Sequence, residues 1–187
     1  MIGSMSEHSL APSLLLSMPQ LHDPNFAQTV VLLCQHSEEG AFGLVMNRPV
    51  TTTAKVMAHG TMQEPAEHEL EVWIGGPVEP DRSWILLPDD DSDDEAIRVC
   101  EGVFLSTSAS VLQRIIDHDA DDRTRLIAGY AGWGPGQLDA ELAASAWLSV
   151  EVHPDLIFDT PAEDMWERAI RRLGATPGHL QTGQGVH

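Results

Sequence analysis

The chain has 187 residues, the length of one globular domain, and its 42% hydrophobic and 21% charged residues are ordinary for a packed fold. Its charge is unusual, because 29 acidic residues against 10 basic ones leave a net charge of −19. Such a surface repels the phosphate backbone and disfavours direct binding of nucleic acid. The sequence has no cationic leader and no apolar run of about 20 residues, which predicts a soluble cytoplasmic protein without a membrane segment.

The first half of the chain predicts short strands joined by tight turns. Apolar runs at 29–34 and 42–46 flank a polar turn with Gly40, a spacing typical of a β-hairpin. Residues 51–59 are predicted to form one or two helical turns. Further strands are expected at 71–74, 83–87, 96–99 and 103–105, with the acidic run 89–95 as a solvated loop.

The second half mixes helices with strands. Apolar residues at helical spacing predict a helix over 111–116, capped by Ser106, Thr107 or Ser108, and a second helical pattern runs from Leu138 to Ala146. Strands are predicted at 126–128, 147–152 and 156–158, with a Gly-rich loop after the first of them.

The C-terminal helix has the strongest pattern. Met165, Trp166, Ala169, Ile170 and Leu173 form one apolar stripe. Its predicted start is a capping box of Thr160 and Glu163 with Pro161 at the first helical position, and Gly174 ends it.

Strands and helices alternate without a regular βαβ rhythm, which favours an α+β fold. The sequence predicts a single domain over 10–174, a frayed N-terminus over 1–9 and a disordered tail over 175–187.

Three segments could carry chemistry, and each has a simpler structural interpretation. The stretch 129–137 sits where backbone N–H groups can hold an anion, yet it matches no phosphate-binding motif and is better explained as a turn that packs Trp133. Cys34 and His36 could form a nucleophile or metal site, although a buried Cys is the commoner case. The run 89–95 has oxygen ligands for a divalent cation but no EF-hand spacing, and we interpret it as a solvated loop.

No zinc motif and no nucleophile elbow is present, so no metal, cofactor or catalytic residue is predicted. Two cysteines are too few for a disulfide framework and are expected to be reduced thiols, which leaves a single Cys34–Cys100 disulfide open.

Arg48 and Arg82 stand out in a chain with so few basic residues, because each follows a predicted strand, where a guanidinium can be aimed at a carboxylate or phosphate. The alternative is that both pair with the abundant acids and lock loops in place. The predicted ligand- or partner-binding set is Asn47, Arg48, Gly75, Gly76, Arg82, Gly132, Trp133, Gly134 and Gln137.

Several unusual segments, in order, resemble the AlgH/YqgE family of bacterial proteins, also called UPF0301. They are LLLSMP at 14–19, DPNF at 23–26, EEGAFGLVMNRP at 38–49, GGPV at 75–78, GYAGWGPGQL at 129–138 and LIFDTP at 156–161. The resemblance implies a mixed, largely antiparallel bifurcated sheet curled into a barrel-like core, with helices packed outside. The sequence departs from the family at Ser83–Trp84 and in the long acidic insert 89–95.

Members of the family are named as regulators, through a link to alginate production. The resemblance implies no catalytic residues. We therefore expect a non-enzymatic regulatory or interaction module that acts through a protein partner. The alternative is a small-molecule-binding protein or enzyme with a pocket framed by the Gly-rich loops. Direct DNA binding conflicts with the charge, and the oligomeric state is left open.

Overall fold

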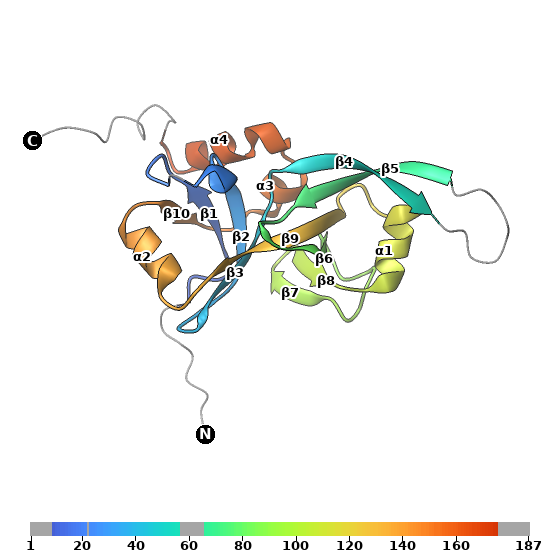
Figure 1. Ribbon diagram of the computed structural model, residues 1–187, viewed down its shortest axis with the longest axis horizontal. Helices are drawn as coiled ribbons and strands as arrows, with labels where there is room; N and C mark the ends of the chain where they lie inside the picture. Colours follow the sequence, from blue (N-terminus) through green and yellow to red (C-terminus); the bar gives the residue numbers. More distant parts are fainter. Residues whose placement is uncertain (1–8, 22, 57–65, 176–187) are drawn as a thin grey trace, which may run out of the picture.

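The computed structural model describes residues 9–21, 23–56 and 66–175, with the side chains of 53–56 and 66–68 left aside. Figure 1 shows a curled sheet with helices on its outside. The helical elements are η1 (Pro24–Phe26), α1 (Ala109–Ile116), α2 (Gln137–Ala143), α3 (Pro154–Phe158) and α4 (Ala162–Arg172). The strands are β1 (Ser13–Ser17), β2 (Val30–Ser37), β3 (Gly40–Val45), β4 (Pro49–Val56), β5 (Ala66–Ile74), β6 (Val78–Leu87), β7 (Ile97–Cys100), β8 (Val103–Ser106), β9 (Arg125–Trp133) and β10 (Trp147–Val150).

The sheet divides at the long strand β9. Its main path runs β10-β1-β2-β3-β9-β6-β8-β7, and all neighbours on this path are antiparallel. On one side of β9, β3 pairs with residues 131–133, and β5 pairs in parallel with Ile127 and Ala128. Strand β4 pairs with β5 in turn. This arrangement confirms the expected α+β fold with a bifurcated, largely antiparallel sheet.

The central strands are buried on both faces, which explains why their sequences are continuous apolar runs. In β1, Leu14 and Leu16 join the main core while Leu15 joins a second core under α2. In β2, Val30 and Leu32 face the first core and Val31 and Leu33 face the second. A third cluster packs α1 against β6 through Val111 and Ile85.

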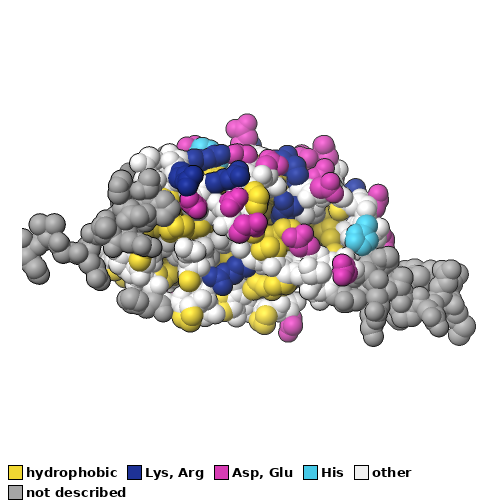
Figure 2. All heavy atoms as spheres, turned by 90° about the horizontal axis from the view of Figure 1, so that it is seen from above, with side chains coloured by type: hydrophobic (Ala, Val, Ile, Leu, Met, Phe, Trp, Pro, Cys, Tyr) yellow, Lys and Arg dark blue, Asp and Glu magenta, His cyan; other side chains and the backbone are white. Residues whose placement is uncertain are grey.

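Helix α4 covers the main core through Met165, Trp166, Ala169 and Ile170, as its apolar stripe predicts. The indole of Trp166 donates to the carbonyl oxygen of Ser17 at 3.0 Å, which ties the last helix to the first strand. Carboxylates and arginines are interspersed over the face seen in Figure 2. Within the described part of the chain, no helix is both long and apolar enough to span a bilayer.

The hairpin of β2 and β3, the strands β7 and β8, and Ser108 as the cap of α1 are as predicted. Three predictions were wrong. Residues 51–56 are part of β4 rather than helical, because their threonines pair along β5, and 57–59 lie outside the described residues. The apolar run 156–158 lies in α3, where all three side chains are buried under α4. Pro161, rather than Thr160, is the N-cap of α4, since the Thr160 hydroxyl donates to the Asp155 carbonyl.

The Gly-rich segment is also more regular than expected. Strand β9 continues through Gly129 and Gly132 to Trp133, so only residues 134–136 form the loop. The predicted frayed N-terminus and disordered tail lie outside the described residues except at Ser9, which is exposed, and Ala175, which packs against the core.

Candidate ligand-binding site

Three hollows matter for function, and the structure distributes the predicted binding residues among them and the sheet. Arg82 lies in one hollow, Asn47 and Arg48 lie in a second, and the glycines, Trp133 and Gln137 lie in none of these three.

The first, the aromatic–arginine hollow, has a volume of about 510 Å³. Its lining comes from β2, β3, β9, β6, β8 and β7, which are consecutive in the sheet, so the hollow follows one face of the curl. The lining residues are Cys34, Gln35, Phe42, Arg82, Trp84, Ile97, Arg98, Val99, Leu105 and Tyr130. No carboxylate is among them.

Three aromatic rings form one wall of this hollow. The ring of Phe42 lies 5.0 Å from Trp84 and 5.1 Å from Tyr130, and Trp84 meets Tyr130 edge-on at 6.4 Å. The indole nitrogen of Trp84 has no solvent-accessible surface and no hydrogen-bond partner within the described residues. The wall is therefore a preformed apolar surface with one unused donor.

Two guanidinium groups complete the hollow. Arg82 lies over the ring of Trp84 at 4.5 Å and pairs with Glu79 at 3.4 Å, with both side chains about half exposed. Arg98 has neither an ion pair nor a hydrogen bond in the described part of the chain, whereas six other arginines there form ion pairs. A hydrogen bond with Glu79 is the main cause that raises the pKa of Tyr130.

Cys34 lies at the edge of the main core and is unsuited to nucleophilic chemistry. Burial, with a smaller effect from Cys100, raises the pKa of Cys34 to about 12. The pairing of β2 and β3 shifts between Leu33 and Gln35, which leaves Cys34 in a bulge. His36 instead accepts a hydrogen bond from the Leu10 amide at 3.1 Å and contacts Asp139 at 3.3 Å. The described residues include no interaction between Cys34 and His36.

Asn47 and Arg48 lie in a second hollow of about 420 Å³ beside α4, but their polar groups are already engaged. Asn47 accepts from the Val30 amide at 3.0 Å and donates to the Gln28 carbonyl at 2.9 Å. Arg48 donates to the Ala27 carbonyl at 3.1 Å and to the Thr29 hydroxyl at 2.9 Å. Both side chains therefore hold the segment before β2 in place. The partners of Arg48 are a backbone carbonyl and a hydroxyl, rather than the acids expected.

Gly75 and Gly76 lie at the fork of the sheet, where the chain passes from β5 to β6 beside β9. The Gly75 amide donates to the Ala128 carbonyl at 2.8 Å, and the Gly75 carbonyl accepts from the Val45 amide at 2.8 Å. A Cβ would lie 2.4 Å from the Gly129 carbonyl oxygen at Gly75 and 2.2 Å from Tyr130 backbone atoms at Gly76. These glycines allow two backbones to approach one another, which is a structural role.

The end of β9 is held by a carboxylate on α2. Glu141 Oε2 accepts from the indoles of Trp133 at 2.9 Å and Trp147 at 2.8 Å, and its Oε1 accepts from Gln137 at 3.1 Å. Gln137 in turn accepts from the Gly134 amide at 3.0 Å. The amide of Gly134 is thus already bonded, and a Cβ at Gly132 would meet the Tyr130 ring at 3.4 Å. Trp133 packs in the second core, as the turn interpretation of this segment predicts.

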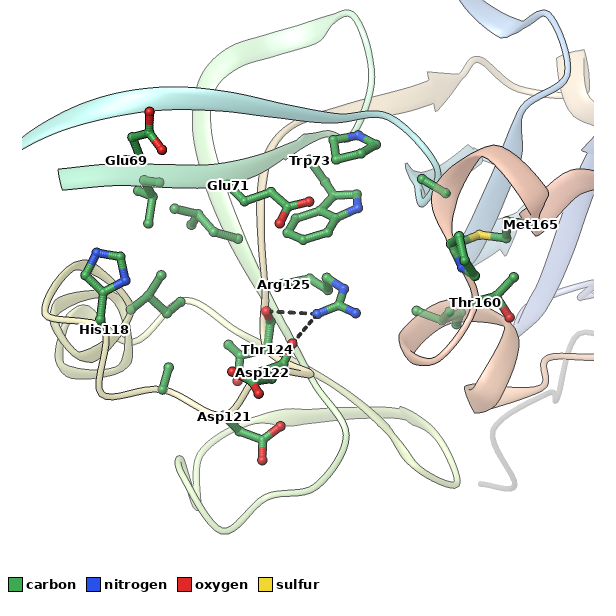
Figure 3. Close-up of a pocket in the computed structure, with 18 of the residues that line it drawn as sticks. Glu69, Glu71, Trp73, His118, Asp121, Asp122, Thr124, Arg125, Thr160 and Met165 are labelled. Atoms are coloured by element: carbon green, nitrogen blue, oxygen red, sulfur yellow. Dashed lines mark hydrogen bonds between the residues drawn. The ribbon is translucent and has the colours of Figure 1, made fainter.

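The largest of the hollows, about 620 Å³, lies between β5, the end of α1 and the start of α4 (Figure 3). Its lining includes five acids, Glu69, Glu71, Asp121, Asp122 and Glu163. Arg125 is its central cation, and it donates to the carbonyls of Asp122 and Phe158, both at 2.7 Å, and lies 4.7 Å from the ring of Trp73. Burial is the main cause that lowers the pKa of Arg125. This guanidinium is a structural tie, and the surrounding acids oppose an anion.

Sequence reasoning missed Phe42, Trp84, Arg98 and Tyr130. They come from four strands and meet only because the sheet curls. One signal was available, since Arg82 directly precedes the strand predicted at 83–87. In the structure β6 includes both Arg82 and Trp84, and residues two apart on a strand share a face. Among the described residues, no group of three His, Cys, Asp or Glu side chains is placed to hold a metal ion.

The fold and the hollow together define an α+β half-barrel protein with an aromatic and cationic depression inside the curl. The AlgH-like family model matches residues 14–178. A UPF0301 protein of Myxococcus xanthus is 40% identical, with 96% of this chain and 99% of that one covered, and a UPF0301 protein of Pseudomonas savastanoi is 38% identical over 97% of each.

Two solved structures agree. The solution structure of the AlgH protein from Pseudomonas aeruginosa has a TM-score of 0.70 and 34% identity, covering 97% of this chain and 98% of that one. A crystal structure of a protein from Corynebacterium diphtheriae, 22% identical with a TM-score of 0.62, shares the fold over 87% of this chain and 86% of that one. The chain belongs to the AlgH family, also called UPF0301, as the resemblance implied.

Proposed function

We propose that this protein is a non-enzymatic regulatory or interaction module that binds an anionic group in the aromatic–arginine hollow. The observation that carries the proposal is Arg98, whose guanidinium has no ion-pair or hydrogen-bond partner in the described residues although the whole chain has 29 acids. Arg98 is exposed and lines the same hollow as three aromatic rings, where its guanidinium can bind a group from outside.

Electrostatics support an anion at this place. Arg82 and Arg98 contribute two positive charges, and no lining residue is acidic. The Arg82–Glu79 pair is exposed, and exposed pairs are worth only about 0–1 kcal/mol. An anion that replaces Glu79 beside Arg82 also takes over its hydrogen bond with the Tyr130 hydroxyl. Elsewhere the negative surface repels anions, which confines them to the hollow.

The aromatic wall adds a preference for a flat apolar group next to the negative charge. Stacking on such rings contributes about 0.5–1.5 kcal/mol beyond the area buried.

The test is titration with 2-naphthalenesulfonate, a flat aromatic anion, followed by the indole N–H resonance of Trp84 in a ¹⁵N-labelled protein. That resonance is identified with Trp84→Phe. We expect saturable shifts, and a loss of at least 10-fold in affinity in Arg98→Met and in Arg82→Met, because a hydrogen bond to a charged group contributes about 1.5–3 kcal/mol.

The matched control is Arg114→Met, which removes the same charge from an exposed arginine on α1 that pairs with Asp119. It should bind like the native protein. Neutral 2-naphthalenemethanol should bind more weakly than the sulfonate. Equal affinity of the native protein and both hollow variants would contradict the proposal.

The proposal includes a cytoplasmic location and action without direct contact to DNA. The free thiols of Cys34 and Cys100 suit a reducing compartment, and the charge of −19 opposes a phosphate backbone. Cell fractionation tests the first part. Retardation of duplex DNA by the pure protein at about 150 mM salt would contradict the second.

A further inference from the structure

We infer that the occupant of the aromatic–arginine hollow is an extended, acidic segment of a partner protein, which adds as a strand to the edge of β7. This inference rests on the proposed function and names the partner for the same site. Strand addition uses backbone groups for affinity and side-chain pockets for specificity.

Strand β7 is a free edge. It ends the path of the sheet, and β8 is the strand that pairs with it in the described part of the chain. Ile97 on this edge is 68% exposed, the largest value among the large hydrophobic residues described. An unpaired strand edge offers backbone N–H and C=O groups to an incoming strand, and natural proteins usually protect such edges.

The hollow and the edge are continuous. Ile97, Arg98 and Val99 all line the hollow, and the pairing of β7 with β8 shifts between Arg98 and Cys100, which interrupts the alternation of side chains there. The hollow therefore reaches β7, the last strand on the path of the sheet. A strand placed along that edge would extend into the hollow.

The opposite wall offers a second free strand side. The register of β1 on β2 ends at Leu33, so Gln35, His36 and Ser37 pair with β3 alone within the described residues. The hollow includes Cys34 and Gln35 from this part of β2 and residues 97–99 from β7. The curl of the sheet therefore leaves a seam between two strand segments, and an extended peptide is the shape that fills a seam.

Charge selects the partner. An antiparallel β7 from a second copy would bring another Arg98 close to the first, and like charges across strands are destabilising. Acidic side chains of the segment meet Arg82 and Arg98 with opposite charge, and they have to lie at these two positions because the acids of 89–95 and Glu101 flank β7 along the chain. Apolar residues at alternate positions meet Ile97 and the aromatic wall. The four residues of β7 set the paired length at about 13 Å, or four to five residues of the partner.

The test is selection of random heptapeptides displayed on phage against the native full chain. We expect enriched peptides with Asp or Glu alternating with apolar residues. Synthetic copies should slow amide hydrogen exchange in 97–100 at least fivefold and should bind at least 10-fold more weakly to Arg98→Met and to Ile97→Glu. Ile97 is exposed, so its substitution leaves the core intact.

The matched controls are Arg114→Met and Val50→Glu, which place the same changes on exposed residues away from the hollow. Both should bind the peptides like the native protein. The inference is overturned if no peptide is enriched, if the enriched peptides lack acids, or if they bind without protecting 97–100. If 2-naphthalenesulfonate still binds in those cases, the proposed anion site is retained and only the strand-like partner is refuted. If neither the peptides nor 2-naphthalenesulfonate bind, both the anion site and the strand-like partner are refuted.

Discussion

The substitution Glu141→Ala tests whether one carboxylate holds the end of β9. In the structure, Glu141 accepts hydrogen bonds from the indoles of Trp133 and Trp147, at 2.9 and 2.8 Å, and from Gln137 at 3.1 Å. The two indole residues are 7% and 3% exposed, so water reaches them poorly once the carboxylate is gone.

The expected loss follows from the number of donors left without an acceptor. Each buried donor without a partner costs about 1–3 kcal/mol, which gives about 2–6 kcal/mol for two indoles. Glu141 is itself only half-buried, so water entering through its place reduces the loss, and we expect about 2–4 kcal/mol. For a protein of this size that lowers the melting temperature by roughly 4–16 °C.

The assay is urea unfolding followed by tryptophan fluorescence, with the indole N–H resonances as a local readout. Glu141→Gln keeps one carbonyl oxygen with two lone pairs, so about half of the loss should be recovered. Asp139→Ala on the same helix removes an exposed carboxylate that contacts His36 and should cost less than about 1 kcal/mol. A loss below about 0.5 kcal/mol for Glu141→Ala would refute the reasoning.

Three further predictions concern the fork, an ion pair and the thiols. Gly75→Ala should destabilise the fold by about 2 kcal/mol or more in urea unfolding, because its Cβ would lie 2.4 Å from a backbone oxygen. The hydrogen bond from Arg172 lowers the pKa of Asp155 below its unfolded value of about 4, so the pair stabilises the fold above that pH and the contribution is lost as the pH falls through the lowered pKa. Arg172→Met should therefore lower the melting temperature at pH 7 and change it little at pH 2. Iodoacetamide at pH 8 should modify Cys100 before Cys34, because burial raises the pKa of Cys34 to about 12.

Each of these has a matched control. Gly136→Ala has open space around its Cβ and a φ of +71°, so only the backbone term of about 1–2 kcal/mol applies there. Arg168→Met, which removes an i,i+4 pair with Asp164 on the same helix, should have the smaller effect at pH 7. Equal rates of alkylation for both thiols in the native protein, and unequal rates in urea, would contradict the burial of Cys34.

The sequence was sufficient where the signal is local. Apolar runs in β2 and β3, the Ser108 cap and the stripe of α4 depend on side-chain periodicity within one element, so they could be predicted from neighbouring residues. The predictions failed where a distant partner decides. Residues 51–56 become a strand because β5 pairs with them. The capping prediction failed for a nearer reason, since the Thr160 hydroxyl donates to the Asp155 carbonyl five residues before it.

The candidate site shows the same division. Arg82 could be selected from the sequence, because a scarce cation beside a predicted strand is a local observation. The sequence could not show that Arg82 shares a hollow with Arg98, Trp84 and Phe42. These residues are separated along the chain and meet through the pairing of β3, β9, β6, β8 and β7.

The family, the α+β class and the acidic character were determined by the sequence alone, because they are properties of composition and of ordered local motifs. Only the tertiary structure decided which arginine lacks a partner. The local sequence of an arginine does not show which group it will meet. In the structure Arg48 donates to the backbone before β2, whereas Arg98 lies on the edge strand β7. The pairing of strands that are far apart in the sequence places these side chains. Each arginine can form hydrogen bonds or ion pairs only with the groups that this pairing brings close to it.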